Sequence, residues 1–242
     1  MFWSKQQKIQ LFVRHCHFSE ISQHKGRMNG FSRQKCYENL LATVDLERVD
    51  ITLLLDTFHP VSTPHFTTLQ NDFPVIEINE GSETGSFLRL LDHVMSLKLK
   101  DDTIVYFLED DYLHRDGWVD VLLEGFSIPT ASYLTLYDHR DKYFLPMYHD
   151  LQSKIFHTPT CHWRTTPSTT NTYAMRYSTL KEHLQIHRQF SVGRRITADH
   201  EKFLELGRQG AQVISPIPGW STHVDAGQTS PCVDWESLCV LR

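Results

Sequence analysis

The chain has 242 residues, of which 40% are hydrophobic and 22% are charged, and its formal net charge at pH 7 is −5. This length allows a full hydrophobic core, in one large domain or two small ones, and the composition is ordinary for a globular protein. The acidic balance and the lack of a Lys/Arg block argue against a nucleic-acid partner.

The amino-terminal segment MFWSKQQKIQLFV has no apolar stretch followed by a small-residue cleavage site, so we predict no signal peptide. No apolar run approaches the ~18–20 residues that cross a bilayer. We therefore expect a cytoplasmic protein. Residues 1–8 leave open a peripheral contact with the cytoplasmic face of a membrane.

The five cysteines are odd in number, and no two of them form a C-x-x-C pair. Free and mostly buried thiols are therefore favoured over a structural zinc site. The residues are Cys16, Cys36, Cys161, Cys232 and Cys239.

The first half of the chain alternates between strand and helix patterns. Runs of β-branched and apolar residues predict strands at 8–16, 49–58, 74–79 and 103–110. Helical spacing predicts helices at 32–44, with Ser32 as N-cap, and at 85–98. This order predicts an α/β fold with a mixed, mostly parallel sheet and helices on both faces.

Charged residues stand near the carboxyl ends of three of these predicted strands. Arg14 belongs to the first strand and Asp56 to the second, while Glu109, Asp110 and Asp111 end the fourth. In open α/β sheets, ligands bind outside the carboxyl ends of the strands. We therefore expect these side chains to converge at a binding site on one edge of the sheet.

The acidic triplet at 109–111 directly follows the apolar stretch TIVYFL. Adjacent carboxylates repel each other unless a cation or a proton relieves them, and they are rarely buried without a partner. Mg²⁺ and Mn²⁺ prefer such oxygen ligands and keep positions open for water and substrate phosphates. A solvated turn or a cap of the next segment is the alternative, but the position after a buried strand favours a metal site.

Two features of the second half carry further candidates. The segment at 194–216 is predicted to form a helix, with Gly210 as its C-cap, and then a strand at 211–215. Asp199 falls near the helix start, where a plain N-cap is the simplest interpretation. His223 lies in the Gly-flanked segment GWSTHVDAG, although a lone histidine is more often structural than a ligand.

Taken together and in this order, these features resemble the GT-A-fold glycosyltransferases, in particular small transferases that build polysaccharides. Members of that family use nucleoside-diphosphate sugars and end a core strand in an acidic motif, to which Glu109-Asp110-Asp111 is similar. The resemblance implies that Asp111 is a direct metal ligand and that Asp110 lies beside the ribose and the sugar. His223 is similar in position to a carboxyl-terminal histidine that binds the metal in many members.

The segment ADHEKFLELGRQG resembles the x-E-D motif of the family. Asp199 stands on the Asp of that motif and is implied as the catalytic base, while Ala198 replaces its Glu. The resemblance implies a single domain over 1–242. Residues 1–115 would bind the nucleotide sugar, and residues 116–242 would bind the acceptor and carry the catalysis.

Further donor contacts are implied near the ends of the first three strands. Asp56 is similar to the acid that contacts uracil or ribose. The segment at 79–94 resembles the helix start under the diphosphate, with Arg89 as its basic candidate. Arg14 and Glu109 complete the implied donor set.

The resemblance places the acceptor-binding surface between the two motifs. Trp163 and neighbouring tyrosines are candidates to stack on a sugar ring, with Asp138, His139 and Arg164 as hydrogen-bonding partners. The alternative is that these residues are ordinary core aromatics and surface-loop residues.

The implied reaction moves a sugar from a nucleoside-diphosphate sugar to a hydroxyl of a saccharide or lipid-linked saccharide, with Mn²⁺ or Mg²⁺ as cofactor. If Asp199 takes the acceptor proton, the reaction inverts the anomeric carbon, and if it only positions the acceptor, retention stays open. A sugar-nucleotide nucleotidyltransferase is disfavoured because no Gly-rich basic loop follows the first strand. A non-catalytic carbohydrate- or metal-binding module stays open because Ala198 departs from the motif.

Overall fold

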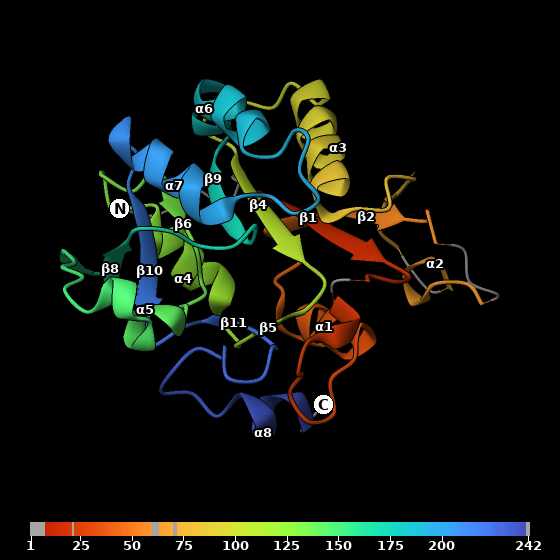
Figure 1. Cartoon of the computed structure of the whole chain (residues 1–242), viewed down its shortest axis with the longest axis horizontal. Helices are drawn as coiled ribbons and strands as arrows, with labels where there is room; N and C mark the ends of the chain where they lie inside the picture. The colour runs from red at the N-terminus through yellow and green to blue at the C-terminus, as the bar shows by residue number, and fades with distance from the viewer. Residues whose placement is uncertain (1–7, 21, 60–62, 70–71, 241–242) are drawn as a thin grey trace.

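The computed structural model of the chain describes residues 8–20, 22–59, 63–69 and 72–240. Within these residues nine strands form one sheet in the order β3-β2-β1-β4-β9-β6-β10-β8-β7 (Figure 1). In that order the strands are β3 (Val75–Ile78), β2 (Val49–Asp56), β1 (Ile9–Cys16), β4 (Ile104–Glu109), β9 (Tyr173–Arg176), β6 (Tyr133–Leu134), β10 (Val213–Ile217), β8 (His162–Thr166) and β7 (Ile155–His157).

The sheet has a parallel half and a mixed half. The four strands β3, β2, β1 and β4 pair in parallel, as the alternating pattern of the first half predicts. Strand β9 then pairs antiparallel with both β4 and β6, and β8 pairs antiparallel with β10 and β7. Strand β10 pairs in parallel with β6. The sheet is therefore mixed, and its parallel half gathers the carboxyl ends of β1, β2 and β4.

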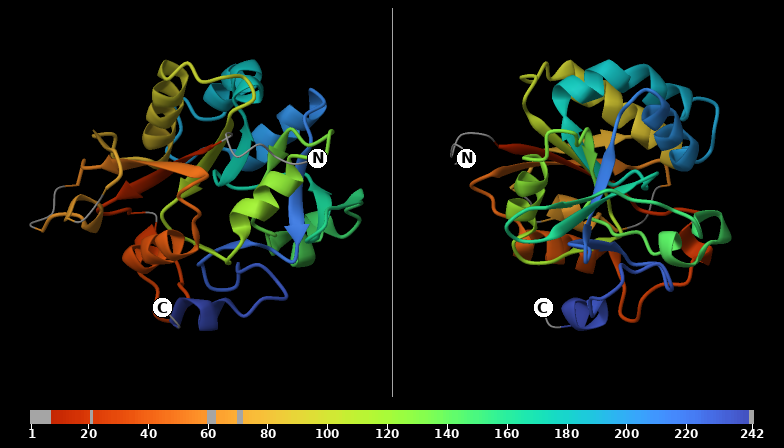
Figure 2. Two further views of the ribbon diagram at one scale, coloured as in Figure 1. Left: turned by 180° about the vertical axis from the view of Figure 1, so that it is seen from behind. Right: turned by 90° about the vertical axis from the view of Figure 1, so that its left-hand side faces the viewer.

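Helices cover both faces of the sheet (Figure 2). Helices α1 (Arg33–Thr43) and α4 (Trp118–Gly125) contribute to the hydrophobic core of one face. Helices α3 (Glu83–Ser96), α6 (Tyr177–Gln189) and α7 (Asp199–Arg208) contribute to the core of the other. The remaining short helices are α2 (Phe66–Leu69), α5 (Asp141–Phe144), α8 (Trp235–Val240) and the 3₁₀ turns η1 (Ser22–His24) and η2 (Pro146–Tyr148).

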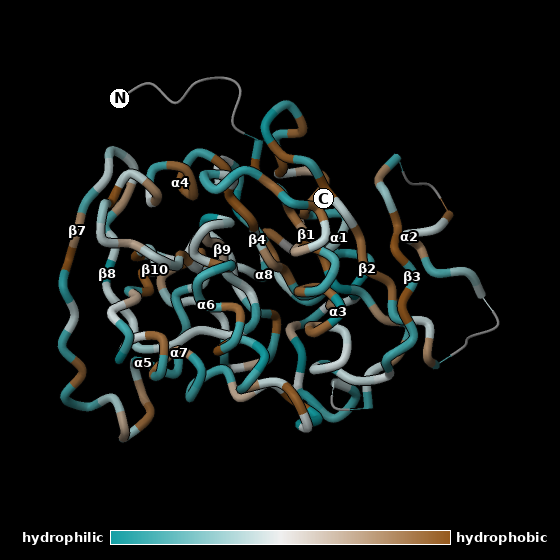
Figure 3. Tube along the Cα trace, turned by 90° about the horizontal axis from the view of Figure 1, so that it is seen from above, coloured by the Kyte–Doolittle hydropathy of each residue, from teal (hydrophilic) through white to brown (hydrophobic). Residues whose placement is uncertain are grey.

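Strand β1 shows why the central strands have so few polar residues. Its side chains alternate between the faces, so Ile9 and Leu11 pack on the α1 and α4 side while Phe12 packs on the α3 side. All three are fully buried. A strand covered on both faces has no side that faces water, which explains its apolar character. Hydrophobic colour also follows β4 through the centre of the molecule (Figure 3).

Helix boundaries follow from capping residues. Ser32 caps α1 by accepting a hydrogen bond from the Lys35 amide at 3.1 Å, as predicted. Ser82 does the same for α3 with the Gly85 amide at 3.0 Å, so this helix begins two residues before the predicted start. Helix α7 begins at Asp199, where the sequence places the start of this helix. Gly210 follows the α7 C-cap with a left-handed φ of 90°.

A small second sheet lies at the carboxyl end of β4. Strands β5 (Tyr112–His114) and β11 (Ser221–His223) pair antiparallel, with His223 opposite Tyr112. The Val224 amide also donates to the Asp111 carbonyl at 3.1 Å. This pairing brings the carboxyl-terminal part of the chain beside the acidic triplet.

The sequence predicts that the thiols are free and mostly buried. The four cysteines with described side chains are free, but only Cys36 is buried, Cys16 and Cys161 are half-buried and Cys232 is exposed. The expectation of mostly buried thiols is therefore wrong.

In the described part of the chain, no helix is both long and apolar enough to cross a membrane. The expected peripheral contact falls on residues 1–8, of which 1–7 lie outside the described residues.

Candidate active site

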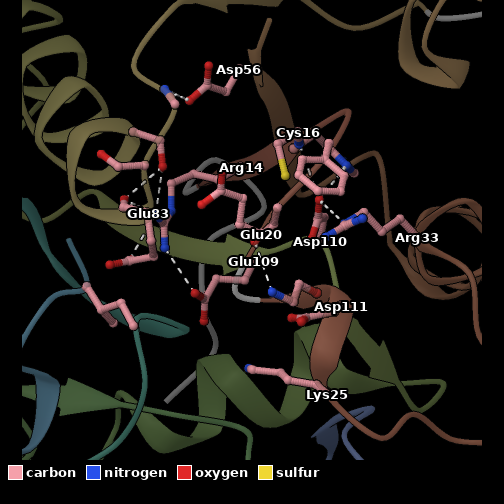
Figure 4. Close-up of a pocket in the computed structure, with 18 of the residues that line it drawn as sticks. Arg14, Cys16, Glu20, Lys25, Arg33, Asp56, Glu83, Glu109, Asp110 and Asp111 are labelled. Atoms are coloured by element: carbon pink, nitrogen blue, oxygen red, sulfur yellow. Dashed lines mark hydrogen bonds and ion pairs between the residues drawn. The ribbon is translucent and has the colours of Figure 1, made fainter. Parts of the chain in front are cut away.

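A cleft of about 330 Å³ opens at the carboxyl ends of β1, β2 and β4 (Figure 4). It brings together candidates from both halves of the chain, as expected for an α/β sheet. Its lining includes Arg14, Asp56, Glu109, Asp110, Asp111, Asp199 and His223, together with Lys25, Arg33 and Glu83. Seven of the twelve site residues that the sequence suggests thus line one cleft.

Each acid of the triplet contacts a different basic group. Glu109 Oε1 lies 3.2 Å from Arg14 Nη2, on the neighbouring strand β1, and Asp110 Oδ2 lies 2.9 Å from Arg33 Nε, at the start of α1. Asp111 Oδ2 lies 3.0 Å from His223 Nε2. The repulsion inside the triplet is therefore relieved by three separate elements that fold onto the end of β4.

Burial and these partners set the pKa values of the triplet. Burial raises the pKa of Glu109 to about 7, against the opposing effect of Arg14. Burial also raises the pKa of Asp110, although Arg33 opposes it. At Asp111 the same burial is outweighed by His223 and Arg27, which hold the pKa of this carboxyl well below its usual range. Asp111 is therefore the acid of the triplet that stays ionised most firmly.

Asp111, His223 and Asp225 form a cluster whose ligand atoms all lie within 4.8 Å of one another. His223 Nδ1 lies 3.3 Å from Asp225 Oδ2, and His223 Nε2 faces Asp111. Asp225 was not predicted from the sequence. Its spacing of two residues from His223 is a usable signal, because alternate residues of an extended segment point to the same side.

Two cations already contact this cluster. Arg27 Nη1 lies 2.9 Å from Asp111 Oδ2 and 2.6 Å from Asp225 Oδ1. Lys25 Nζ lies 3.1 Å from Asp225 Oδ2. The cluster therefore presents a concentration of negative charge that attracts cations from several directions.

The chemistry of the cluster fits a divalent ion. Two carboxylates and one imidazole offer oxygen and nitrogen atoms at convergent positions, and the buried Asp225 Oδ1 has no aligned hydrogen-bond donor. Carboxylate oxygens suit Mg²⁺ and Mn²⁺ alike, whereas an imidazole nitrogen suits transition metals. The donor set is therefore compatible with a divalent metal ion.

Asp199 also lines the cleft and is the first residue of α7. The N-cap of that helix is Ala198, and no side chain makes the capping hydrogen bond, so the interpretation of Asp199 as a plain N-cap is wrong. Its carboxylate instead accepts a hydrogen bond from Lys202 Nζ at 2.9 Å. Burial raises the pKa of Asp199 to about 6, so the group is a carboxylate at neutral pH that can still accept a proton.

Glu83 also lines the cleft and was not predicted from the sequence. It is the first residue of α3, and its Oε1 lies 3.1 Å from Arg14 Nη1. Its two oxygens also accept hydrogen bonds from Asn171 Nδ2 and the Thr197 amide, each at 2.8 Å. An acid in the first turn of a helix that follows a sheet strand was the only sequence signal for this role.

Two predicted donor contacts have other partners. The Asp56 carboxylate lines the cleft but accepts hydrogen bonds from the backbone amides of Phe58, Glu80 and Gly81, so it holds the loop before α3 in place. Arg89 is exposed and pairs with Glu80 at 2.8 Å. Arg89 is not among the cleft residues, because its helical position turns it outward from the side that carries Glu83.

The four predicted acceptor contacts lie outside the cleft. Trp163 is fully buried in the core, so the prediction that it stacks on a sugar is wrong. Asp138 is also buried and accepts from Arg164 Nη2 at 2.7 Å and from Tyr143 at 2.6 Å. His139 pairs with Asp141 at 3.3 Å. The burial of Trp163 follows from the antiparallel pairing of β8 with β10, a long-range contact that the local sequence does not reveal.

Comparisons with known proteins bear on the fold. No family model matches the chain, and no curated protein matches it in sequence. The chain is similar to the crystal structure of S. aureus TarS 1-349, with 9% identity and a TM-score of 0.50, over 86% of this chain and 58% of that chain. It is also similar to GalNAc-T7 with UDP, GalNAc and Mn²⁺, with 8% identity and a TM-score of 0.57, over 91% of this chain and 44% of that chain.

The chain thus spans about half the length of these two solved structures, at 58% and 44%. At such low identity the likeness shows the fold alone. The chain has a GT-A-like fold, and this confirms the fold class predicted from the sequence.

Proposed function

We propose that the chain is a metal-dependent glycosyltransferase that moves a sugar from a nucleoside-diphosphate sugar to a hydroxyl of a saccharide acceptor. One observation carries the proposal: Asp111 and His223, which form the cluster with Asp225, line the same cleft as Asp199, at the carboxyl ends of the central strands. The fold supports it but does not define the chemistry, which depends on the site.

The residues of the cleft fall into two groups with different roles in the proposed reaction. Asp111, His223 and Asp225 would hold a divalent ion, which when bound supplies Lewis-acid stabilisation to the departing diphosphate. Asp199 accepts the proton of the acceptor hydroxyl as the new bond forms. We favour an in-line displacement with inversion, in which Asp199, from α7, acts on the acceptor while the cluster acts on the diphosphate.

The proposed metal is Mn²⁺, because the imidazole of His223 completes the donor set. The proposed donor nucleotide is UDP, since GalNAc-T7, which has the same fold, is solved with UDP and Mn²⁺. Residues 1–115 would supply most donor contacts, including Arg14 and Arg33, and residues 116–242 would supply Asp199 and the acceptor side. The acceptor is a saccharide of a polysaccharide-building reaction, free or lipid-linked.

The test is Mn²⁺-dependent release of free nucleoside diphosphate from a panel of UDP-, GDP- and dTDP-sugars, with and without saccharide acceptors. We expect release from at least one donor, abolished by a chelator and restored by Mn²⁺. Tight binding of a donor without release, in the presence of every acceptor, would instead indicate a non-catalytic module. Release of pyrophosphate from a nucleoside triphosphate would indicate a nucleotidyltransferase.

A further inference from the structure

Lys202 is a lysine that is buried completely, on the face of α7 that packs against the sheet. Its side chain is 0% exposed, and its Nζ lies 4.9 Å from the ring centre of Phe87 and 5.1 Å from those of Tyr173 and Phe203. Removing an ammonium group from water is costly unless it is paired and hydrogen-bonded. A fully buried ammonium group is therefore expected to have specific partners that stabilise its charge.

The ammonium group has two hydrogen-bond acceptors. Lys202 Nζ donates to Asp199 Oδ1 at 2.9 Å and to Asn171 Oδ1 at 2.5 Å. Asn171 is itself fixed, because its Nδ2 donates to Glu83 Oε1 at 2.8 Å. The three aromatic rings close the remaining side of the ammonium group, so it has one position and it fixes one oxygen of Asp199.

We propose that Lys202 is a positioning residue that orients the Asp199 carboxylate in the cleft and favours its ionised form. This rests on the proposed function, in which Asp199 takes a proton from the acceptor. With Oδ1 held by Lys202, the other oxygen of Asp199 is the one that faces the acceptor. The lysine does not touch substrate and acts only through Asp199.

Other charged groups near Asp199 act in both directions. Glu83, from α3, raises the pKa of Asp199, whereas Lys202 and Arg14 lower it. Asp199 in turn raises the pKa of Glu109, on β4. Lys202 is the largest of the charges that oppose burial. Loss of the Lys202 charge therefore leaves the effects of burial and of Glu83 less opposed, and this favours the protonated form of Asp199.

The first experiment is the pH profile of turnover for Lys202→Met, which keeps the length and the apolar stem of the side chain. Losing an opposite charge at this distance raises a carboxyl pKa by about 1–3. The acidic limb of the profile should move to higher pH by the same amount, with a loss of roughly tenfold at pH 7 that recovers at alkaline pH. Lys202→Gln, which can still donate to Asp199, should retain more activity at each pH.

The matched control is Lys181→Met. Lys181 also pairs with an aspartate, Asp101, but both side chains are exposed, at 41% and 71%. Its profile should coincide with that of the wild type. A loss for Lys202→Met that is equal at all pH values would indicate a merely structural role and would overturn the proposal.

A second measurement does not need turnover. In protein labelled with ¹³C at the aspartate carboxyl carbons, the resonance that is missing in Asp199→Asn identifies Asp199. Its titration midpoint should rise in both Lys202→Met and, by a smaller amount, Lys202→Gln. An unchanged midpoint overturns the role of Lys202 even if Asp199 proves essential. A raised midpoint together with full activity of Asp199→Asn would instead refute Asp199 as the base.

Discussion

The carboxylate of Asp111 contacts both His223 and Arg27, at 3.0 and 2.9 Å, and its pKa is held well below the usual range although the group is buried. A buried anion held by cations is suited to exchange one of them for a metal ion. These contacts make Asp111 the ligand on which metal binding should depend most.

We expect Asp111→Asn to keep the fold and to lose Mn²⁺-dependent binding of the nucleoside diphosphate. The amide cannot supply the negative charge that a divalent ion needs. Isothermal titration with Mn²⁺ and UDP, beside a circular dichroism spectrum, checks both parts. Asp120→Asn is the control, because Asp120 is a largely exposed acid that pairs with Arg48 at the surface. If Asp111→Asn bound Mn²⁺ and UDP with wild-type affinity, the triplet would not be part of the metal site.

Arg27 competes with any metal for Asp111 and Asp225, because its guanidinium lies between their oxygens. Arg27→Gln should therefore bind Mn²⁺ more tightly in the absence of nucleotide, by roughly tenfold if one charged hydrogen bond is relieved. Titration of Mn²⁺ into nucleotide-free protein measures this. Weaker binding would mean that Arg27 supports the ligand geometry and does not compete.

Asp199→Asn preserves the size of the side chain and can still accept from Lys202, but it cannot take a proton. Turnover should fall by about 10²–10⁴, the usual contribution of a general base, while the donor affinity changes little. The melting temperature should fall as well, because the buried ammonium group of Lys202 loses its counter-charge. In the wild type, turnover should fall as the pH drops through about 6, because protonation of Asp199 removes the base. Near-normal turnover of the variant, or a product with retained anomeric configuration, would contradict the assignment.

At the scale of elements, the cleft depends on how loops are tied to strand ends. The end of β2 holds the loop before α3 through Asp56, whose two oxygens accept three backbone amides. Gly81 in that loop has φ of 66°, and an added Cβ would lie 2.5 Å from the Phe58 ring. Strand β2 therefore helps to fix the start of α3, and with it Glu83, although β3 lies between the two in the chain.

Asp56→Ala should destabilise the fold by about 1–3 kcal/mol, because three backbone amides lose their acceptor, and it should weaken donor binding. Urea unfolding and the KM for the donor measure the two effects. Asp50→Ala is a control on the same strand, since Asp50 is exposed and bonds Lys8 and Gln10 at the surface. A loss of donor binding without a loss of stability would instead indicate direct contact with the donor.

At the scale of the whole molecule, the cleft is lined by residues from Arg14 to His223, so almost the entire chain contributes to one site. A ligand that binds there stabilises the complete fold and not one segment. At 100 times its Kd, a ligand adds about 2.7 kcal/mol to the free energy of unfolding.

We therefore expect Mn²⁺ and UDP together to raise the melting temperature by about 5–11 °C at such a concentration, since about 2–4 °C corresponds to 1 kcal/mol in a domain of this size. Either ligand alone should give a smaller shift. Asp111→Asn should abolish the joint effect. Equal shifts with and without Mn²⁺ would show that the nucleotide binds independently of the metal.

The sequence by itself determined the order of strands and helices in the first half, the Ser32 cap and the acids at the end of β4. These features depend on side chains near one another along the chain, whose periodicity and capping chemistry are local. It also placed Asp111, Asp199 and Arg14 at strand and helix ends. Because the carboxyl ends of parallel strands share one edge of the sheet, the topology then predicts that residues at these ends lie close together.

Only the tertiary structure decided which distant residues meet. The pairing of β5 with β11 puts His223 and Asp225 beside Asp111, and the packing of α7 on the sheet buries Lys202 against Asp199. The same long-range packing buries Trp163. These outcomes depend on strand register and on the fit of side chains from segments far apart in the chain, and local patterns carry no record of either.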